Sequence, residues 1–242
     1  MPGPSKPPER SPEKPNEQRQ YVSFGYFQTD PAWRRLPAEA RKQGKDEFLR
    51  VVEGWLPRMI VRSYTMVGLR ADCDLMLWRV TRTLEDIPQM TSDLLKTGLG
   101  QYLRMPYNYL AMTKRSVYVD KINPEHGEQR LQIVPGRSKY LFVYPFVKTR
   151  EWYRLTKAVR QGMMDEHIKI GTKYPSVKLN TTYSFGLDDQ EFVVAFESDR
   201  PDDFLDLVME LRESEGSRFT LRDTPIFTCM ARDLKDALDL LG

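Results

Sequence analysis

The sequence predicts an α+β protein made of two ferredoxin-like halves, each with the element order β-α-β-β-α-β, which together form a dimeric α+β barrel-type domain. Three observations lead to this prediction. The expected strands and helices follow that order twice along the 242 residues. The Trp-x-Arg-Leu pattern of residues 33–36 recurs 119 residues later at 152–155, and the turn glycine Gly68 recurs 118 residues later as Gly186. Agreement in order and in spacing indicates an internal duplication.

The first half is expected over residues 20–119. The segment before it, 1–19, is rich in proline and charge, which predicts a disordered arm. Asp30-Pro31 begins a helix that Pro37 or Gly44 could interrupt. From hydrophobic periodicity and turn residues, the expected elements are a strand at 20–28, a helix at 30–55, strands at 59–67 and 74–80, a helix at 84–103 and a strand at 107–119.

The second half is expected over residues 139–242, after a connector at 120–138. A connector longer than about 12 residues inside a compact domain is typical of a lid or a binding loop. The same signals predict a strand at 139–148, a helix at 149–170, strands at 177–185 and 190–198, a helix at 201–214, a strand at 225–231 and a short helix from Asp233.

Composition excludes several classes of protein. The chain is 40% hydrophobic and 29% charged, which is ordinary for a globular domain. Its 37 basic and 34 acidic residues are spread evenly, which argues against a nucleic-acid partner. Cys73 and Cys229 lie in apolar runs, as buried reduced thiols do. With no signal-peptide core and no run of about 18 apolar residues, we expect a cytoplasmic protein with no membrane insertion.

Residues 139–171 place the candidate site residues on adjoining elements. The strand offers Tyr144 and Lys148, and the helix after it carries His167 on an apolar stripe and ends near Gly171. Such a pocket would suit an iron porphyrin. From periodicity alone, however, a lone histidine is more often hydrogen-bonded in the core than bound to a metal, and the tyrosine is equally suited to packing.

Three segments carry a resemblance: D-E-H-x-x-x-G at 165–171, Tyr144-Pro145, and the G-L-D-D turn at 186–189. They resemble the chlorite dismutase-like superfamily of haem proteins and, within it, the coproheme decarboxylases. The resemblance covers roughly residues 21–231. It implies that His167 binds the iron and that Glu197 hydrogen-bonds the other ring nitrogen of that histidine, which would fix the tautomer and strengthen the donor.

The resemblance also bears on the opposite face of the haem. Chlorite dismutases carry an arginine there, and its place in this sequence falls on Leu179. The segment is one residue shorter than the family pattern, so Lys178 and Asn180 are alternatives, and His126 in the connector is either a further distal candidate or a surface residue. Coproheme decarboxylases have no fixed residue there and use a radical-forming tyrosine, which Tyr144 matches. Both features favour the decarboxylase branch.

Three further positions resemble propionate-binding residues of the decarboxylases: Arg130, Lys148 and Ser217. Cations and hydroxyls suit a substrate with four carboxylates, because each buried carboxylate needs paired charge and hydrogen bonds. Without the resemblance, both cations would be assigned to the solvated surface. Where some members carry an arginine directly after the H-x-x-x-G motif, this chain has Thr172, which removes one expected contact.

The activity implied is the peroxide-dependent oxidative decarboxylation of Fe-coproporphyrin III (coproheme), which is both substrate and cofactor, to haem b. Tyr144 and Lys148 are the implied catalytic residues. Two alternatives stay open: decomposition of chlorite to chloride and dioxygen, and a haem-binding or haem-transfer protein without turnover. The resemblance further implies a homopentamer and a transient contact with coproporphyrin ferrochelatase.

Overall fold

One antiparallel sheet organises the molecule. The computed structural model describes residues 19–116, 118 and 132–242, so the expected N-terminal arm, apart from its last residue, and most of the connector lie outside the described residues. The strands are β1 (Tyr21–Thr29), β2 (Ile60–Thr65), β3 (Leu75–Thr81), β4 (Leu103–Met112), β5 (Tyr140–Lys148), β6 (Lys178–Tyr183), β7 (Phe192–Ser198), β8 (Thr220–Arg222) and β9 (Phe227–Ala231). The main helices are α1 (Ala38–Trp55), α2 (Asp86–Leu95), α3 (Arg150–Arg154), α4 (Lys157–Gly171), α5 (Pro201–Glu213) and α6 (Leu234–Asp239). Short 3₁₀ turns lie at η2 (Trp33–Arg35), η3 (Gly100–Tyr102) and η7 (Glu215–Phe219).

The strand order is the same in both halves. It runs β4-β1-β3-β2 in the first half and β9-β5-β7-β6 in the second, which is the ferredoxin-like order twice. Pairing of β2 with β9 and of β4 with β6 joins the halves, so the described strands close into a ring to which β8 adds at β5. The predicted fold class is therefore confirmed.

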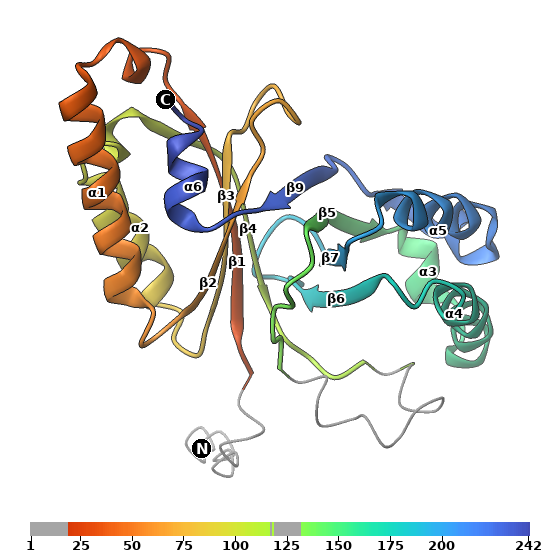
Figure 1. Cartoon of the computed structure of the whole chain (residues 1–242). Coiled ribbons are helices and arrows are strands. Elements are labelled where there is room, and N and C mark those ends of the chain that lie inside the picture. Colours follow the sequence, from red (N-terminus) through yellow and green to blue (C-terminus); the bar gives the residue numbers. More distant parts are fainter. Residues whose placement is uncertain (1–18, 117, 119–131) are drawn as a thin grey trace, which may run out of the picture.

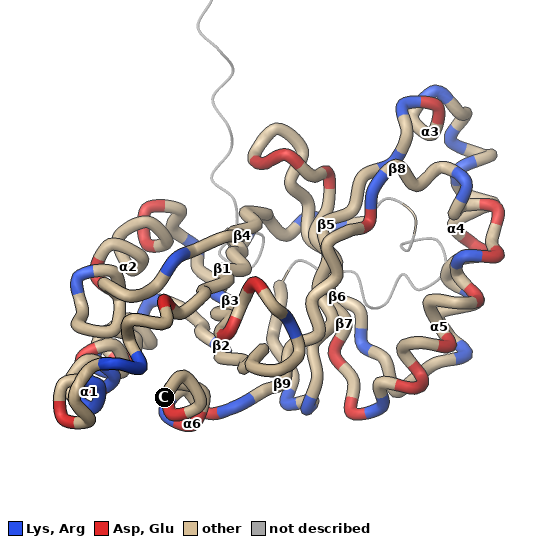
Figure 2. Tube along the Cα trace, turned by 90° about the horizontal axis from the view of Figure 1, so that it is seen from above, with Lys and Arg blue, Asp and Glu red and all other residues tan. Residues whose placement is uncertain are grey.

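The closed sheet separates three groups of apolar side chains. Residues from both halves fill its interior, among them Phe24, Trp78 and Phe227, which are fully buried. Outside, α1, α2 and α6 cover the first half, and α4 and α5 cover the second (Figure 1). Because most strands are buried on both faces, they read as continuous apolar runs with little alternation. Basic and acidic residues are interspersed along both sets of helices (Figure 2).

The sequence repeat is also a repeat of backbone geometry. Trp33 and Trp152 are both buried, and the leucine that ends each short helix has nearly the same extended conformation, with ψ of 152° at Leu36 and 148° at Leu155. The hairpin glycines match as well, because φ is 77° at Gly68 and 72° at Gly186. Only glycine adopts such positive φ values without strain, which explains why it recurs at both turns.

Three predicted helices are too long. The helix expected at 30–55 begins only at Ala38, after Pro37. The helix expected at 149–170 breaks into α3 and α4 at Leu155, so the stripe leading to His167 does not lie on one helix, and Val159 is 45% exposed. The helix expected at 84–103 ends at Leu95. A Cβ on Gly100 would collide with the Leu94 carbonyl oxygen, so the chain turns there in a way that needs glycine. The strand β8 was not predicted.

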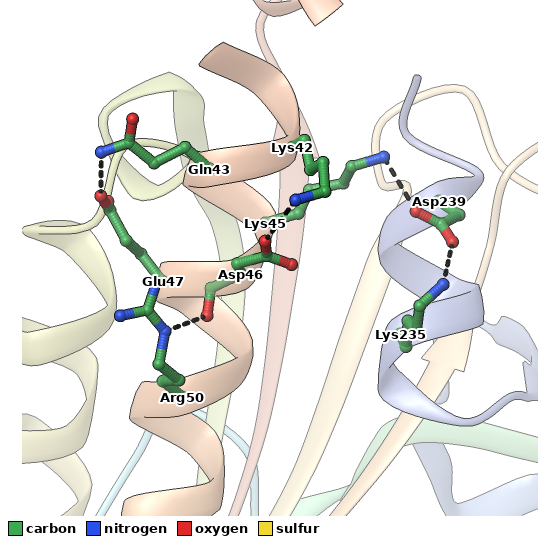
Figure 3. Close-up of polar contacts among 8 residues, drawn as sticks. All are labelled: Lys42, Gln43, Lys45, Asp46, Glu47, Arg50, Lys235 and Asp239. Atoms are coloured by element: carbon green, nitrogen blue, oxygen red, sulfur yellow. Dashed lines mark hydrogen bonds and ion pairs between the residues drawn. The ribbon is translucent and has the colours of Figure 1, made fainter. Parts of the chain in front are cut away.

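An ion pair joins α1 of the first half to the C-terminal helix α6. Lys45 of α1 lies 2.8 Å from the Asp239 carboxylate of α6, which also accepts a hydrogen bond from Lys235 (Figure 3). The last residues of the chain thereby pack against its first helix. None of the helices in the described residues is long and apolar enough to cross a membrane.

Candidate functional site

A cavity of about 410 Å³ lies on the outer face of the second half, between β5 and α5, with α4 and η7 at its edge. Four of the predicted site residues line it: Tyr144, Lys148, His167 and Ser217. Phenylalanines from β5 and α5 form apolar walls, and two of them, Phe142 and Phe204, stack with ring centres 4.0 Å apart. Leu205 and Met209, which are 57% and 60% exposed, lie at the edge. The cavity therefore combines apolar walls with a few polar groups, as small-molecule sites do.

The strand β5 presents the site residues by simple alternation. Leu141 and Val143 point into the closed sheet, whereas Phe142 and Tyr144 belong to the outer cluster under α5. The pairing of β5 with β8 is irregular between Val147 and Lys148, where the strand ends. Residues that are distant in the sequence reach the same cavity because α5 and η7 pack back over this strand.

His167 extends from α4 toward the cavity as a neutral imidazole. Burial, and secondly the charge of Lys148, lower its pKa to about 4. Its ring makes no hydrogen bond with any residue that the structure describes. A neutral imidazole with a free nitrogen lone pair is the form that binds a metal ion.

Lys148 is a charge without a carboxylate partner in the described part of the chain. Its Nζ donates to the Gly216 carbonyl oxygen at 2.7 Å and lies 4.7 Å from the centre of the Trp152 ring. Burial lowers its pKa to about 8, an effect that Glu191 partly offsets. An ammonium group held by one carbonyl and an aromatic face can still accept an anionic partner.

Tyr144 is buried, and its ring stacks on Phe196 with centres 5.9 Å apart. Burial is the main reason that its pKa is raised above the usual value, and the charge of Asp223 adds to the rise. The hydroxyl makes no hydrogen bond with the residues that the structure describes. It stays protonated, at the wall of the cavity that also contains the imidazole.

Sequence reasoning missed an ion pair in this cavity. Arg212 of α5 lies 2.6 Å from Asp223, and both residues line the cavity. Ser217 donates its hydroxyl hydrogen to the Arg212 carbonyl oxygen at 2.7 Å, which holds η7 against the end of α5. The helical spacing of Leu205, Met209 and Arg212 was the signal that could have revealed this second cation.

The expectation for Glu197 is wrong. Its neighbour Phe196 faces α5, so Glu197 points to the opposite side of the sheet from the cavity. There it is 2% exposed and lies 2.9 Å from Asn180 and 3.1 Å from Lys178. It cannot be the hydrogen-bond partner of His167 across the sheet.

Strand alternation separates the three candidates for the distal position. Leu179 pairs with Phe196 and shares its outward face, where it is 45% exposed but does not line the cavity. The two alternatives, Lys178 and Asn180, both bind Glu197 on the other face. Of the three, Leu179 alone lies on the face that carries the cavity. Arg130 and His126 lie outside the described residues.

Comparison with known proteins gives consistent results. The family profile described as chlorite dismutase matches residues 41–232. A curated relative, the coproheme decarboxylase of Mycolicibacterium smegmatis, is 33% identical over 174 residues, which are 70% of this chain and 72% of that protein.

Solved structures resemble the chain along most of its length. A variant of the chlorite dismutase from Candidatus Nitrospira defluvii superposes with a TM-score of 0.84 at 32% identity, covering 92% of this chain and 94% of that one. A haem-binding protein from Thermus thermophilus superposes with a TM-score of 0.81 over 92% of this chain and 95% of that one. At 24% identity, this second likeness concerns the fold alone.

Proposed function

The chain belongs to the chlorite dismutase-like family, and from this membership we propose that it converts Fe-coproporphyrin III to haem b by peroxide-dependent oxidative decarboxylation. The observation that carries the proposal is the composition of the cavity. It combines one neutral imidazole, one buried phenol, the cation Lys148 and the ion pair of Arg212 with Asp223. The curated relative from Mycolicibacterium smegmatis, a coproheme decarboxylase, supports the same choice.

The residues of the cavity fit an iron porphyrin with carboxylate substituents. His167 would hold the iron, because its imidazole is neutral and lacks a hydrogen-bond partner among the described residues. Lys148 would pair with one propionate, and Arg212, which keeps Asp223 as a partner, would donate its remaining N–H groups to another. Ser217 would turn its hydroxyl hydrogen from the Arg212 carbonyl oxygen to a propionate oxygen. The aromatic walls from β5 and α5 would cover the apolar macrocycle. Arg130 is proposed as a further propionate ligand from the resemblance.

Tyr144 and Lys148 would act on the propionate side chain. The iron porphyrin, once bound, would supply the chemistry that reduces hydrogen peroxide to water. The phenoxyl radical of Tyr144 takes a hydrogen atom from the β-carbon of a propionate, and the departure of carbon dioxide leaves a vinyl group. Lys148 orients the carboxylate for this step. Each turnover consumes one propionate carboxylate, one hydrogen peroxide and one proton, and it yields one vinyl group, one carbon dioxide and two waters. Two propionates react in turn.

Chlorite decomposition is the second candidate, because the solved chlorite dismutase is 32% identical and covers most of the chain. That reaction profits from a cation beside the iron. Leu179, the outward residue at the expected distal position, provides neither charge nor a hydrogen bond. We therefore expect little dioxygen from chlorite.

One pair of assays separates the two reactions. The full-length protein is loaded with Fe-coproporphyrin III and titrated with hydrogen peroxide, and the porphyrin is analysed by mass spectrometry. We expect two successive products, each lighter by one carboxyl group and one hydrogen atom. In parallel, an oxygen electrode follows the addition of chlorite. Sustained dioxygen release without decarboxylation would contradict the proposal. If neither decarboxylated porphyrin nor dioxygen formed, a haem-binding protein without turnover would be favoured.

The homopentamer and the contact with coproporphyrin ferrochelatase stay predictions.

A further inference from the structure

The two halves carry cavities at matching places. A cavity of about 710 Å³ lies on the outer face of the first half, between α2 and β4. Six residues between Leu84 and Leu95 line it, and the six residues found 117 positions later, between Pro201 and Arg212, line the cavity of the second half. The duplication has therefore preserved a cavity as well as a fold.

Strand register identifies the corresponding strand residues. Ser23 pairs with Arg79 in the first half as Phe142 pairs with Phe196 in the second. Two residues further along the same strands, Gly25 therefore corresponds to Tyr144. Arg79, which lines the first cavity, thus takes the place of Phe196, and the phenol that lines the second cavity has a glycine as its counterpart.

Gly25 leaves space for the Arg79 guanidinium. A Cβ on Gly25 would lie 2.9 Å from Arg79 Nη2, so a larger residue there would collide with the arginine. Arg79 itself is completely buried and lines the cavity. Because glycine is disfavoured in strand interiors, its presence in β1 indicates that the close approach of Arg79 is required.

Arg79 has no anionic partner in the described part of the chain. Its Nη1 donates to the Thr91 hydroxyl at 2.6 Å, and its Nη2 donates to the Ser23 hydroxyl at 2.8 Å and to Asn108 Oδ1 at 3.2 Å. These acceptors are all neutral, and Nε has no partner. Burial lowers the pKa to about 10, so the group stays charged at neutral pH. A buried charge without a counter-charge is costly, and proteins normally pair it.

We propose that the cavity of the first half binds a small molecule with an apolar body and one carboxylate, for which Arg79 is the counter-charge. Most of the wall is apolar, including Leu84, Ile87 and Met105, and two of its polar residues, Thr91 and Asn108, hydrogen-bond the guanidinium. Thr91 lines the cavity and holds Nη1, so a carboxylate that displaces its hydroxyl reaches the guanidinium directly. This site is independent of the porphyrin site proposed for the second half.

Each cavity contains one methionine that can report binding. Met105 lines the first cavity and Met209 lines the second. The full-length protein is labelled with ¹³C at the methionine methyl groups and titrated with octanoate, with octanol and with acetate. We expect octanoate to shift the Met105 signal saturably. Octanol, which lacks the charge, and acetate, which lacks the apolar body, should bind about ten-fold or more weakly. No saturable shift of Met105 with octanoate would overturn the proposal.

Two variants and one control test the role of the charge. Leu95→Asp adds a carboxylate at a position that lines the cavity and is 41% exposed, so it should repel octanoate without disturbing the fold. Arg79→Met removes the counter-charge and should also weaken octanoate about ten-fold or more. Leu56→Asp makes the matching change at a 51% exposed leucine outside the cavity and should leave binding unchanged. Equal octanoate affinity in the parent and both cavity variants would show that Arg79 only ties the sheet to α2.

Discussion

At the scale of single residues, the site depends on side chains with few partners. His167 and Tyr144 make no hydrogen bonds with the described residues, and Lys148 has only one carbonyl oxygen as a polar neighbour within hydrogen-bond distance. Three groups with shifted pKa values that keep hydrogen-bonding capacity around one cavity are typical of a ligand site. The residue types were predictable from the resemblance, whereas the absence of partners became visible only in the structure.

Replacing the proposed iron ligand tests the first of these groups. We expect His167→Ala to fold like the parent, because the imidazole makes no hydrogen bond that the change would break. The absorption spectrum of the ferric coproheme complex should change, because the axial nitrogen is lost. Adding free imidazole should restore the parent spectrum. If the variant and the parent gave the same spectrum, His167 would not be the ligand.

Removing the Lys148 cation should weaken the binding of the substrate's carboxylates. A charge-assisted hydrogen bond contributes about 1.5–3 kcal/mol, so Lys148→Met should raise the Kd for Fe-coproporphyrin III by about 10- to 100-fold. Binding of the tetramethyl ester, which has no carboxylates, should change little. Lys169→Met, at an exposed lysine of α4, serves as the control. Equal weakening for the acid and the ester would point to lost packing instead of lost charge.

At the scale of elements, the helix predictions failed at their boundaries. Residue patterns gave strand positions well because apolar runs and turn glycines mark them, but hydrophobic periodicity did not reveal the extended residue Leu155 or the tight turn at Gly100. Gly44 shows this most clearly. The sequence offers it as a break in α1, yet the helix continues through it. A glycine is needed at this position because the close contact with the Gly98–Leu99 backbone leaves no space for a side chain.

Two glycines of α1 provide a matched test of that packing. A Cβ on Gly44 would lie 2.7 Å from the Leu99 nitrogen, whereas a Cβ on Gly54 would meet nothing within 4 Å. Gly44→Ala should therefore destabilise the protein by about 1–3 kcal/mol. Gly54→Ala should stabilise it by up to about 1 kcal/mol, through helix propensity. Urea denaturation measures both, and a stabilising Gly44→Ala would show that the interface adapts easily.

Strand alternation explains the error in the role expected for Glu197. The resemblance implied a contact between Glu197 and His167, but a strand sends adjacent residues to opposite faces. Strand alternation around Phe196 was enough to identify the error once the outward face was known. The inward face of β7 could not be recognised from the sequence, because β7 is apolar on both sides.

At the scale of the whole molecule, the duplication explains most of what could be predicted. Two equal halves imply one closed sheet, with the connector linking them, and the sequence contains this information in its repeated Trp-x-Arg-Leu pattern and turn glycines. The difference between the halves was less predictable. The cavity of the second half holds an imidazole and a phenol, whereas the cavity of the first holds Arg79, and that contrast depends on strand register.

The central claim is that Tyr144 performs decarboxylation at the cavity of the second half, and one comparison tests it most directly. The parent, Tyr144→Phe and Tyr140→Phe are loaded with Fe-coproporphyrin III and given equal peroxide, and the porphyrin mass is followed with time. Tyr140 lies on the same strand and the same face but does not line the cavity, so it controls for the loss of a phenol. We predict unchanged binding in all three, normal products from the parent and Tyr140→Phe, and almost none from Tyr144→Phe. Normal decarboxylation by Tyr144→Phe would contradict the account.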